Sequence, residues 1–213
     1  MTGYPCRLAV SFGAWLMLAA AAAPVAAQQS ADSDEAPPRY RVEAIVFSQP
    51  PVGADYQEIP RSEPLAPIDG LAWPLRAPGT TGLGFARLPE SELRLAGAAR
   101  RIDSREGFRV DWHAAWEQPG LDRSSAQGIA LPQGTLRVYL SRFLHAEVRL
   151  QRPAPPRPAP ATAERPDTDA AFWVLDTSRR MRSAEQHYLD HPVMGVIIRV
   201  DPVEPVEPVA PEQ

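Results

Sequence analysis

Apolar and polar side chains alternate along much of the chain, which is the pattern of a strand that buries one face. The clearest stretch is 108–116, whose apolar positions are Phe108, Val110, Trp112, Ala114 and Trp116. The same period of two predicts strands in three further stretches: 40–47, 136–140 and 144–150. The last two strands are predicted at 172–177 and 193–200, where both faces are apolar, as in the centre of a sheet.

One helix is predicted between the strands at 40–47 and 108–116. Pro89 stands where a helix tolerates its missing N–H, and Glu90 and Glu92 place carboxylates at the positive end of the helix dipole. The apolar residues at helical spacing are Leu95, Ala99 and Ile102. Gly107 is positioned to end the helix. We therefore expect one α+β domain over 39–200, a mostly antiparallel sheet with one main helix packed on a face.

Stretches rich in proline, glycine or small polar residues interrupt these elements, and they are predicted to be loops or disordered linkers: 28–38, 48–88, 117–134 and 152–169. The last of these holds six prolines, too many for a strand ladder. The tail, 201–213, repeats Pro-Val-Glu every three residues, which is the period of polyproline II. It is a spacer or a recognition strip for a partner, and its composition favours the spacer.

The first 27 residues have the organisation of a secretory signal peptide. Arg7 precedes an apolar run over 8–23, and small residues up to Ala27 provide the expected cleavage point. The run is shorter than the about 20 apolar residues of a membrane span. Cys6, the only cysteine, precedes the run, so it is not the lipid-bearing cysteine of a lipoprotein, and the mature chain has no disulfide. We expect a cleaved signal peptide over 1–27 and a soluble periplasmic protein.

The mature chain is acidic. Cleavage removes one charged residue, Arg7, so the formal net charge falls from −4 to −5. An acidic chain without a basic stripe is not expected to bind nucleic acid. All 22 basic residues are arginines, whose planar guanidinium groups suit carboxylates and phosphates. Genomic base composition explains the same bias.

The sequence lacks complete forms of the usual metal-binding, dinucleotide-binding and nucleophile motifs. His187 and His191 have the i, i+4 spacing of zinc sites on helices, with Asp190 between them, but Pro192 disfavours helical angles at His191. The glycines of 82–84 lack the third glycine of a dinucleotide-binding loop. The mature chain has no thiol and no serine in a nucleophile elbow. We therefore expect no metal and no other cofactor, and the sequence offers no catalytic nucleophile.

Carboxyl groups are the remaining catalytic candidates, because glycan cleavage uses two of them, one on each side of the bond. Four lie near the predicted helix and are expected on its solvent face: Glu90, Glu92, Asp103 and Glu106. Asp111 and Glu117 remain open, since the sequence does not give their separation.

The stretch 179–192 concentrates the side chains best suited to hold a ligand. Guanidinium groups bind carboxylates bidentately, and aromatic rings cover the faces of sugars. Strand alternation places Arg180 and Arg182 on one face. The candidate ligand-binding residues are Arg179, Arg180, Arg182, His187, Tyr188, His191 and, from the long loop, Trp73. Ion pairs with aspartates such as Asp176 and Asp190 explain the arginines equally well, and hydrogen bonds in a turn explain the histidines.

Several blocks in a fixed order make the chain resemble the CsiV family. They are YRVEAIVF at 40–47, FRVDWHAAWEQP at 108–119, GTL at 134–136, RFLH at 142–145, the arginine- and histidine-rich stretch 179–192 and GVI at 195–197. The resemblance implies a periplasmic protein of Gram-negative bacteria that binds peptidoglycan. It also implies support of a bifunctional penicillin-binding protein together with a lipoprotein activator. The proline-rich insert and the tail depart from the family pattern.

We therefore expect a non-enzymatic accessory protein of the periplasm that binds peptidoglycan and supports cell-wall synthesis. The alternative is an adaptor that docks a cell-wall synthase or its lipoprotein activator without touching the wall. A third hypothesis, a wall hydrolase, depends on the open carboxyl groups described above.

Overall fold

The computed structural model of the protein describes residues 36–51, 60–66, 68, 72–155 and 171–204. The predicted signal peptide over 1–27 and most of the predicted lead-in, proline-rich insert and tail lie outside these residues. Within them, no helix has the length and apolar character needed to cross a bilayer.

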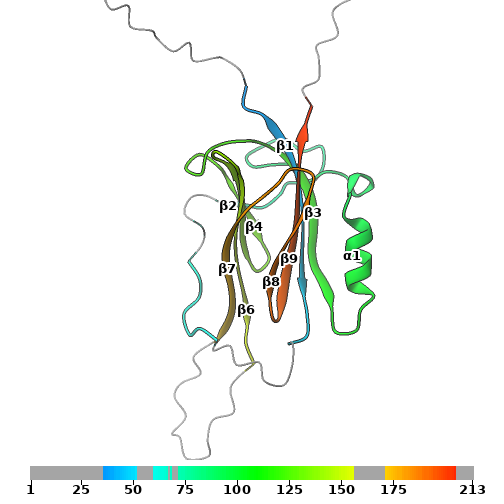
Figure 1. Cartoon of the computed structure of the whole chain (residues 1–213), viewed down its shortest axis with the longest axis vertical. Helices are drawn as coiled ribbons and strands as arrows, with labels where there is room; N and C mark the ends of the chain where they lie inside the picture. The colour runs from blue at the N-terminus through cyan, green and yellow to red at the C-terminus, as the bar shows by residue number, and fades with distance from the viewer. Residues whose placement is uncertain (1–35, 52–59, 67, 69–71, 156–170, 205–213) are drawn as a thin grey trace, which may run out of the picture. The chain divides into compact units, whose positions relative to one another are not determined.

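The described residues form two β-sheets that pack face to face (Figure 1). Sheet A has the strand order β3-β1-β9-β8, from Arg109–Pro119, Arg39–Ser48, Met194–Val203 and Gln186–His191. Sheet B has the order β2-β4-β5-β6-β7, from Ala72–Trp73, Gly128–Leu131, Gly134–Leu140, Leu144–Pro153 and Phe172–Arg180. All neighbours pair antiparallel except β2 and β4, which pair parallel.

The alternation in the sequence explains why each strand faces two environments. On β1, Val42, Ala44 and Val46 face the space between the sheets and join a core that contains residues of both sheets. That core includes Trp116, which is 0% exposed. Burial of such side chains removes apolar surface from water, which is the main force that holds the two sheets together.

A buried glutamine ties the two sheets together within this core. Gln118 on β3 accepts a hydrogen bond of 2.9 Å from the indole N–H of Trp116, and its own amide donates one of 2.8 Å to the carbonyl of Val138 on β5. Both polar ends of the side chain are therefore satisfied, as a buried amide requires.

The outer face of sheet A carries the single helix of the described residues, α1, at Ala96–Asp103 (Figure 1). Leu95 and Ala98 pack there on Ile45 and Phe47 of β1. The predicted apolar positions Ala99 and Ile102 lie against the same cluster.

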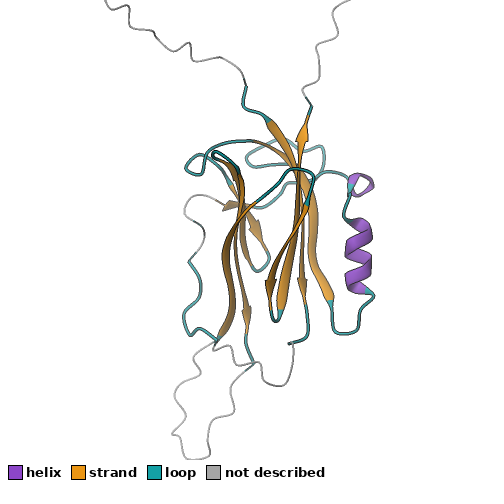
Figure 2. Ribbon diagram, viewed as in Figure 1, coloured by secondary structure: helices purple, strands orange, loops and turns teal. Residues whose placement is uncertain are grey.

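The prediction of an α+β fold, with one antiparallel sheet and one main helix, is wrong. The protein is mostly β-structure in two sheets, and its helix has only eight residues (Figure 2). Glu90–Glu92 forms a separate 3-10 turn, and Leu93 after it is extended. The helix predicted to start at Pro89 therefore starts only at Ala96. Alternation predicts that one face of each strand is buried, but it does not say what covers that face. A second sheet can bury it just as a helix can.

Several strand assignments also change, and β2 and β4 lie in stretches that were predicted to be loops, 48–88 and 117–134. The stretch 172–177 belongs to β7, which is an edge strand of sheet B rather than a central one, whereas β9 is central in sheet A. Residues 186–191, which were not predicted as a strand, form β8. The period of two is interrupted at Arg142, between the predicted strands 136–140 and 144–150, and the structure has a tight turn there, between β5 and β6.

Candidate functional site

Three arginines gather where β7 ends and the chain turns toward β8. Arg179, Arg180 and Arg182 line a small hollow of 280 Å³ together with Glu185 and His187. All three arginines are exposed, while Met181 between them is 3% exposed and anchors the segment in the core. Strand alternation predicts Arg180 and Arg182 on one face and Arg179 on the other, whereas the structure gathers all three around one hollow. Contact of these arginines with a ligand remains a prediction.

The contacts of the three guanidinium groups leave their positive charge largely unbalanced. Arg179 Nη1 donates a hydrogen bond of 3.0 Å to the carbonyl of Tyr188. The guanidinium of Arg180 lies 3.4 Å from the ring centroid of Phe143. Arg182 has a 76% exposed side chain and reaches Glu185 only at 3.7 Å, an exposed pair of small energetic value.

Hydrogen bonds hold the backbone of this segment in place. The backbone N–H of Arg182 donates to Nε2 of His187 at 2.9 Å, and His187 itself is 8% exposed. Ala184 has a φ of 63°, in the left-handed region that sharp turns use, and its N–H donates to the carbonyl of Val200. His187 is thus a structural support for the hollow, and the arginines are held on a rigid turn.

The sequence interpretation missed the aromatic partner of this cluster. Phe143, 38% exposed, sits in the turn between β5 and β6, beside Arg180 and within 5.5 Å of Arg142. Its signal was the break in alternation at Arg142, which brings this turn to the surface. We call Arg179, Arg180, Arg182 and Phe143 the arginine patch.

On the outer face of sheet B, two stacked rings lie in the same cross-strand row as Arg180. Tyr139, His145 and Arg180 are direct partners across β5, β6 and β7, so they form one row. The rings of Tyr139 and His145 stack with centroids 5.1 Å apart. Tyr139 is only 9% exposed and His145 is half-buried, so Arg180 is the one exposed member of this row.

The other predicted residues lie elsewhere. Tyr188 is on the outer face of sheet A, where its ring stacks on Phe47 and its hydroxyl donates to Asp190. Burial and this hydrogen bond raise the pKa of Tyr188. His191 is 5% exposed, and its Nδ1 accepts a hydrogen bond from the N–H of Val193. Neither residue joins the hollow of the arginine patch.

Trp73 is separated from the arginine patch by the width of sheet B. It lies on β2, at one edge of the sheet, whereas the arginines follow β7 at the other edge. Four strand spacings of about 4.8 Å place the two edges about 19 Å apart. A ligand contact of Trp73 would therefore be separate from that of the arginines.

The two histidines at i, i+4 lie on a strand and not on a helix. His187 and His191 lie on strand β8, where four residues correspond to about 13 Å, too far apart to share a metal ion. Among the described residues, no group of His, Cys, Asp and Glu side chains is arranged to hold a metal.

Three buried carboxyl groups, Glu43, Glu147 and Asp201, are not set up as general acids. Burial alone raises the pKa values of Glu43, Glu147 and Asp201, but hydrogen bonds from their partners outweigh it and the net pKa values are lowered. The chief partners are His113 for Glu43, Arg137 for Glu147 and Arg199 for Asp201. Glycan cleavage needs a carboxyl group with a raised pKa, so none of these three fits that role.

Comparison with known families adds a finding to this geometry. The family model described as "Peptidoglycan-binding protein, CsiV" matches residues 12–203 of the chain. The protein belongs to the CsiV family. The resemblance inferred from the sequence blocks is thereby confirmed, and peptidoglycan binding is the function that the family description gives. Searches among curated proteins and among solved structures returned no match.

Proposed function

We propose that this CsiV-family chain is a non-enzymatic protein of the periplasm that binds peptidoglycan through the arginine patch. The observation that carries the proposal is the set of three exposed guanidinium groups around one hollow, with the ring of Phe143 beside them. Peptidoglycan offers carboxylates on its stem peptides and ring faces on its sugars, which are the complements of these two features.

Weak binding at this patch is sufficient for function on a polymer. Each exposed guanidinium contributes a modest contact, but many protein copies along one wall, or a tethering partner, raise the effective concentration of the site. We further propose that the protein supports cell-wall synthesis by a bifunctional penicillin-binding protein and its lipoprotein activator.

Co-sedimentation with purified sacculi tests wall binding. The wild type is expected to sediment with sacculi, and the double variant Arg180→Ala/Arg182→Ala should lower the binding constant about tenfold or more, since two charged contacts are lost. The matched control is Arg100→Ala/Arg101→Ala, which removes the same charge from the exposed side of α1. Absence of wild-type binding, or equal losses in both double variants, would contradict the proposal.

The supporting role is tested with a purified bifunctional penicillin-binding protein and its lipoprotein activator. Addition of the chain is expected to increase the rate of glycan polymerisation. If the chain binds the synthase or activator but not the sacculi, the adaptor hypothesis replaces wall binding. Release of muropeptides from sacculi by the chain alone would establish a hydrolase instead.

A further inference from the structure

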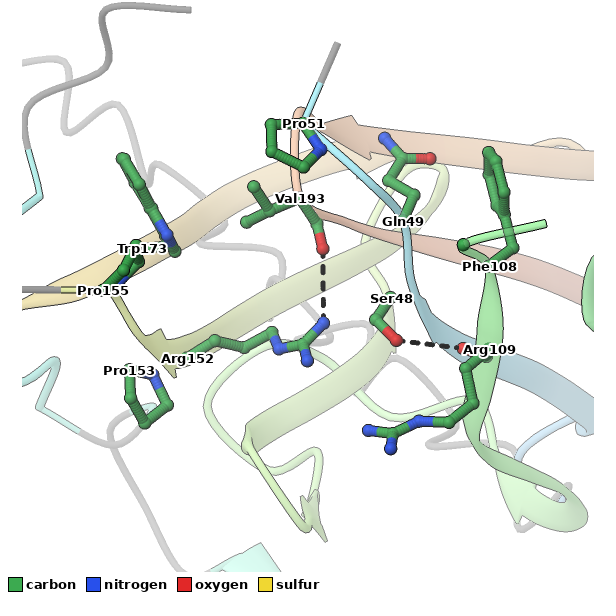
Figure 3. A pocket seen from close by; sticks show the side chains of 11 residues that line it. Ser48, Gln49, Pro51, Phe108, Arg109, Arg152, Pro153, Pro155, Trp173 and Val193 are labelled. Carbon is green, nitrogen blue, oxygen red and sulfur yellow. Dashed lines mark hydrogen bonds between the residues drawn. The ribbon is translucent and has the colours of Figure 1, made fainter.

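A second concave site lies at the opposite end of the two sheets. It has a volume of 870 Å³ and is formed where β1 and β3 of sheet A face β6 and β7 of sheet B (Figure 3). The residues that matter for its chemistry are Ser48, Phe108, Arg109, Arg152, Trp173 and Val193. We call this site the end groove.

The charged side chains that line the end groove are both arginines. Figure 3 shows the guanidinium groups of Arg152 and Arg109 extending toward one another from opposite walls. Arg152 Nη1 donates a hydrogen bond of 3.3 Å to the carbonyl of Val193, which orients its side chain across the floor. The arginines thus converge from two different sheets on one space.

One buried carboxylate serves both arginines. The side chain of Asp111 is 6% exposed, and its Oδ1 accepts hydrogen bonds of 2.9 and 2.7 Å from Arg109. Its Oδ2 has no hydrogen-bond partner and lies 3.8 Å from Arg152 Nη1. Two cations therefore share one anion, and a buried carboxylate oxygen without a hydrogen bond is a costly arrangement that sites for ligands tolerate. The floor keeps one positive charge for an anionic ligand.

Charged groups of both signs lie beside the groove among the described residues. Arg105 lies over the ring of Phe108, with its guanidinium carbon 4.3 Å from the centroid. Asp190 accepts hydrogen bonds from Gln49 and Tyr188, and Asp103 accepts one from the N–H of Val110. The charged side chains that line the groove itself are cationic.

The walls of the end groove are apolar. Phe108 and Trp173 stand on opposite sides, and the prolines that line the site are Pro51, Pro153 and Pro155. The ring of Trp173 is backed by the buried ring of His191, with centroids 6.5 Å apart. An apolar slot with a few converging donors is the usual form of a small-ligand site.

We propose that the end groove binds the stem peptide of peptidoglycan, with a peptide carboxylate on Arg109 and Arg152 and an apolar side chain between Phe108 and Trp173. This inference rests on the proposed function and adds a second subsite to it. Trp173 and Arg180 are seven residues apart on β7, which corresponds to about 23 Å. A single wall fragment that spans this distance engages both the groove and the arginine patch, which increases avidity.

Titration calorimetry of the full mature chain with a soluble disaccharide–tetrapeptide tests the inference. The wild type is expected to bind it, and the same disaccharide without its peptide is expected not to compete. Arg152→Gln and Arg109→Gln should each weaken binding about tenfold, the loss of one charged contact. Arg101→Gln, on the exposed side of α1, is the control and should bind like the wild type.

If Arg152→Gln does not fold, Trp173→Phe provides a second change within the groove. It keeps an apolar wall, so it should weaken binding of the disaccharide–tetrapeptide, but less than Arg109→Gln does. Failure of the wild type to bind the disaccharide–tetrapeptide, or equal binding by all groove variants, would overturn the inference. So would equal affinity for the peptide-free disaccharide. If sacculi still retain the wild type in these cases, the groove inference alone has failed. If sacculi do not retain it, the proposed function has failed as well.

Discussion

The Nε2 atom of His113 donates a hydrogen bond of 2.8 Å to the Oε1 atom of Glu43, on the neighbouring strand of sheet A. The same carboxylate accepts hydrogen bonds of 2.8 Å from the backbone N–H groups of Arg94 and Leu95. Helix α1 has no side-chain cap of its own, so a residue about 50 positions earlier in the sequence caps its N-terminus. A buried, fully satisfied carboxylate thus fixes the helix on the sheet.

Substitution Glu43→Gln is expected to lower the free energy of unfolding by about 2–3 kcal/mol. The amide keeps the shape of the side chain, but its NH₂ group faces donors, so at least one buried N–H loses its acceptor. Urea unfolding followed by circular dichroism measures the change. Glu90→Gln, at an exposed position of the 3-10 turn, is the control and should change stability by less than about 0.5 kcal/mol. Equal stability of the two variants would show that the cap is unimportant.

Stability should fall in acid because of the same carboxylate. Burial by itself raises the pKa of Glu43, but hydrogen bonds from His113 and from the N–H groups of Leu95 and Arg94 outweigh it, and the pKa lies below its ordinary value of 4.5. The stabilisation is therefore fully present above pH 4.5 and is lost as the pH falls through the folded value.

Unfolding measured from pH 6 down to about pH 3 checks this linkage. The difference in stability between the wild type and Glu43→Gln is expected to shrink below pH 4.5, because glutamine does not titrate. The wild type itself should lose more stability in this range than Glu43 alone explains, since Asp201 and Glu147 also have lowered pKa values. A constant difference down to pH 3 would contradict the assignment.

The ion pair of Arg137 with Glu147 is the most buried one of the described residues, with side chains 4% and 7% exposed and a distance of 2.6 Å. Arg137→Met leaves the buried carboxylate with only the more exposed Arg123 and Arg149 nearby. We expect a loss of about 3 kcal/mol in thermal or urea unfolding.

Two comparisons separate the buried charge from the loss of packing. Arg137→Met combined with Glu147→Leu should recover most of the stability, because no unpaired charge remains in the interior. Arg39→Met removes an exposed pair with Glu117 and should cost less than about 1 kcal/mol. If the double variant is no more stable than Arg137→Met, desolvation of Glu147 is not the cause.

Gly195 is needed because two aromatic rings cover it. A Cβ atom at this position would lie 2.5 Å from Phe47 and 2.8 Å from Tyr188, whose rings stack with centroids 6.0 Å apart. Gly195→Ala is therefore expected to displace Tyr188 and to lower stability by about 1–3 kcal/mol, measured by urea unfolding. Gly97→Ala, within α1 and without such a contact, should be neutral or stabilising. Equal effects of the two changes would contradict this account.

The sequence alone predicted the features that depend on residues close together in the chain. Alternation located the strands that became β1, β3, β5 and β6, because the side chains of a strand point to its two faces in turn, and continuous apolar runs located β7 and β9. The sequence also showed that three cations follow one apolar strand, but only the structure brings Arg179 to the same hollow as Arg180 and Arg182.

Only the tertiary structure decided which surfaces meet. Alternation states that one face of a strand is buried but not whether a helix or a second sheet covers it, and here a second sheet does. Phe143 joins Arg180 through the pairing of β6 with β7, and Arg152 faces Arg109 because the two sheets pack against one another. The cap of α1 by Glu43 has the same origin. Such contacts arise from the packing of whole layers, which a pattern over ten residues does not encode.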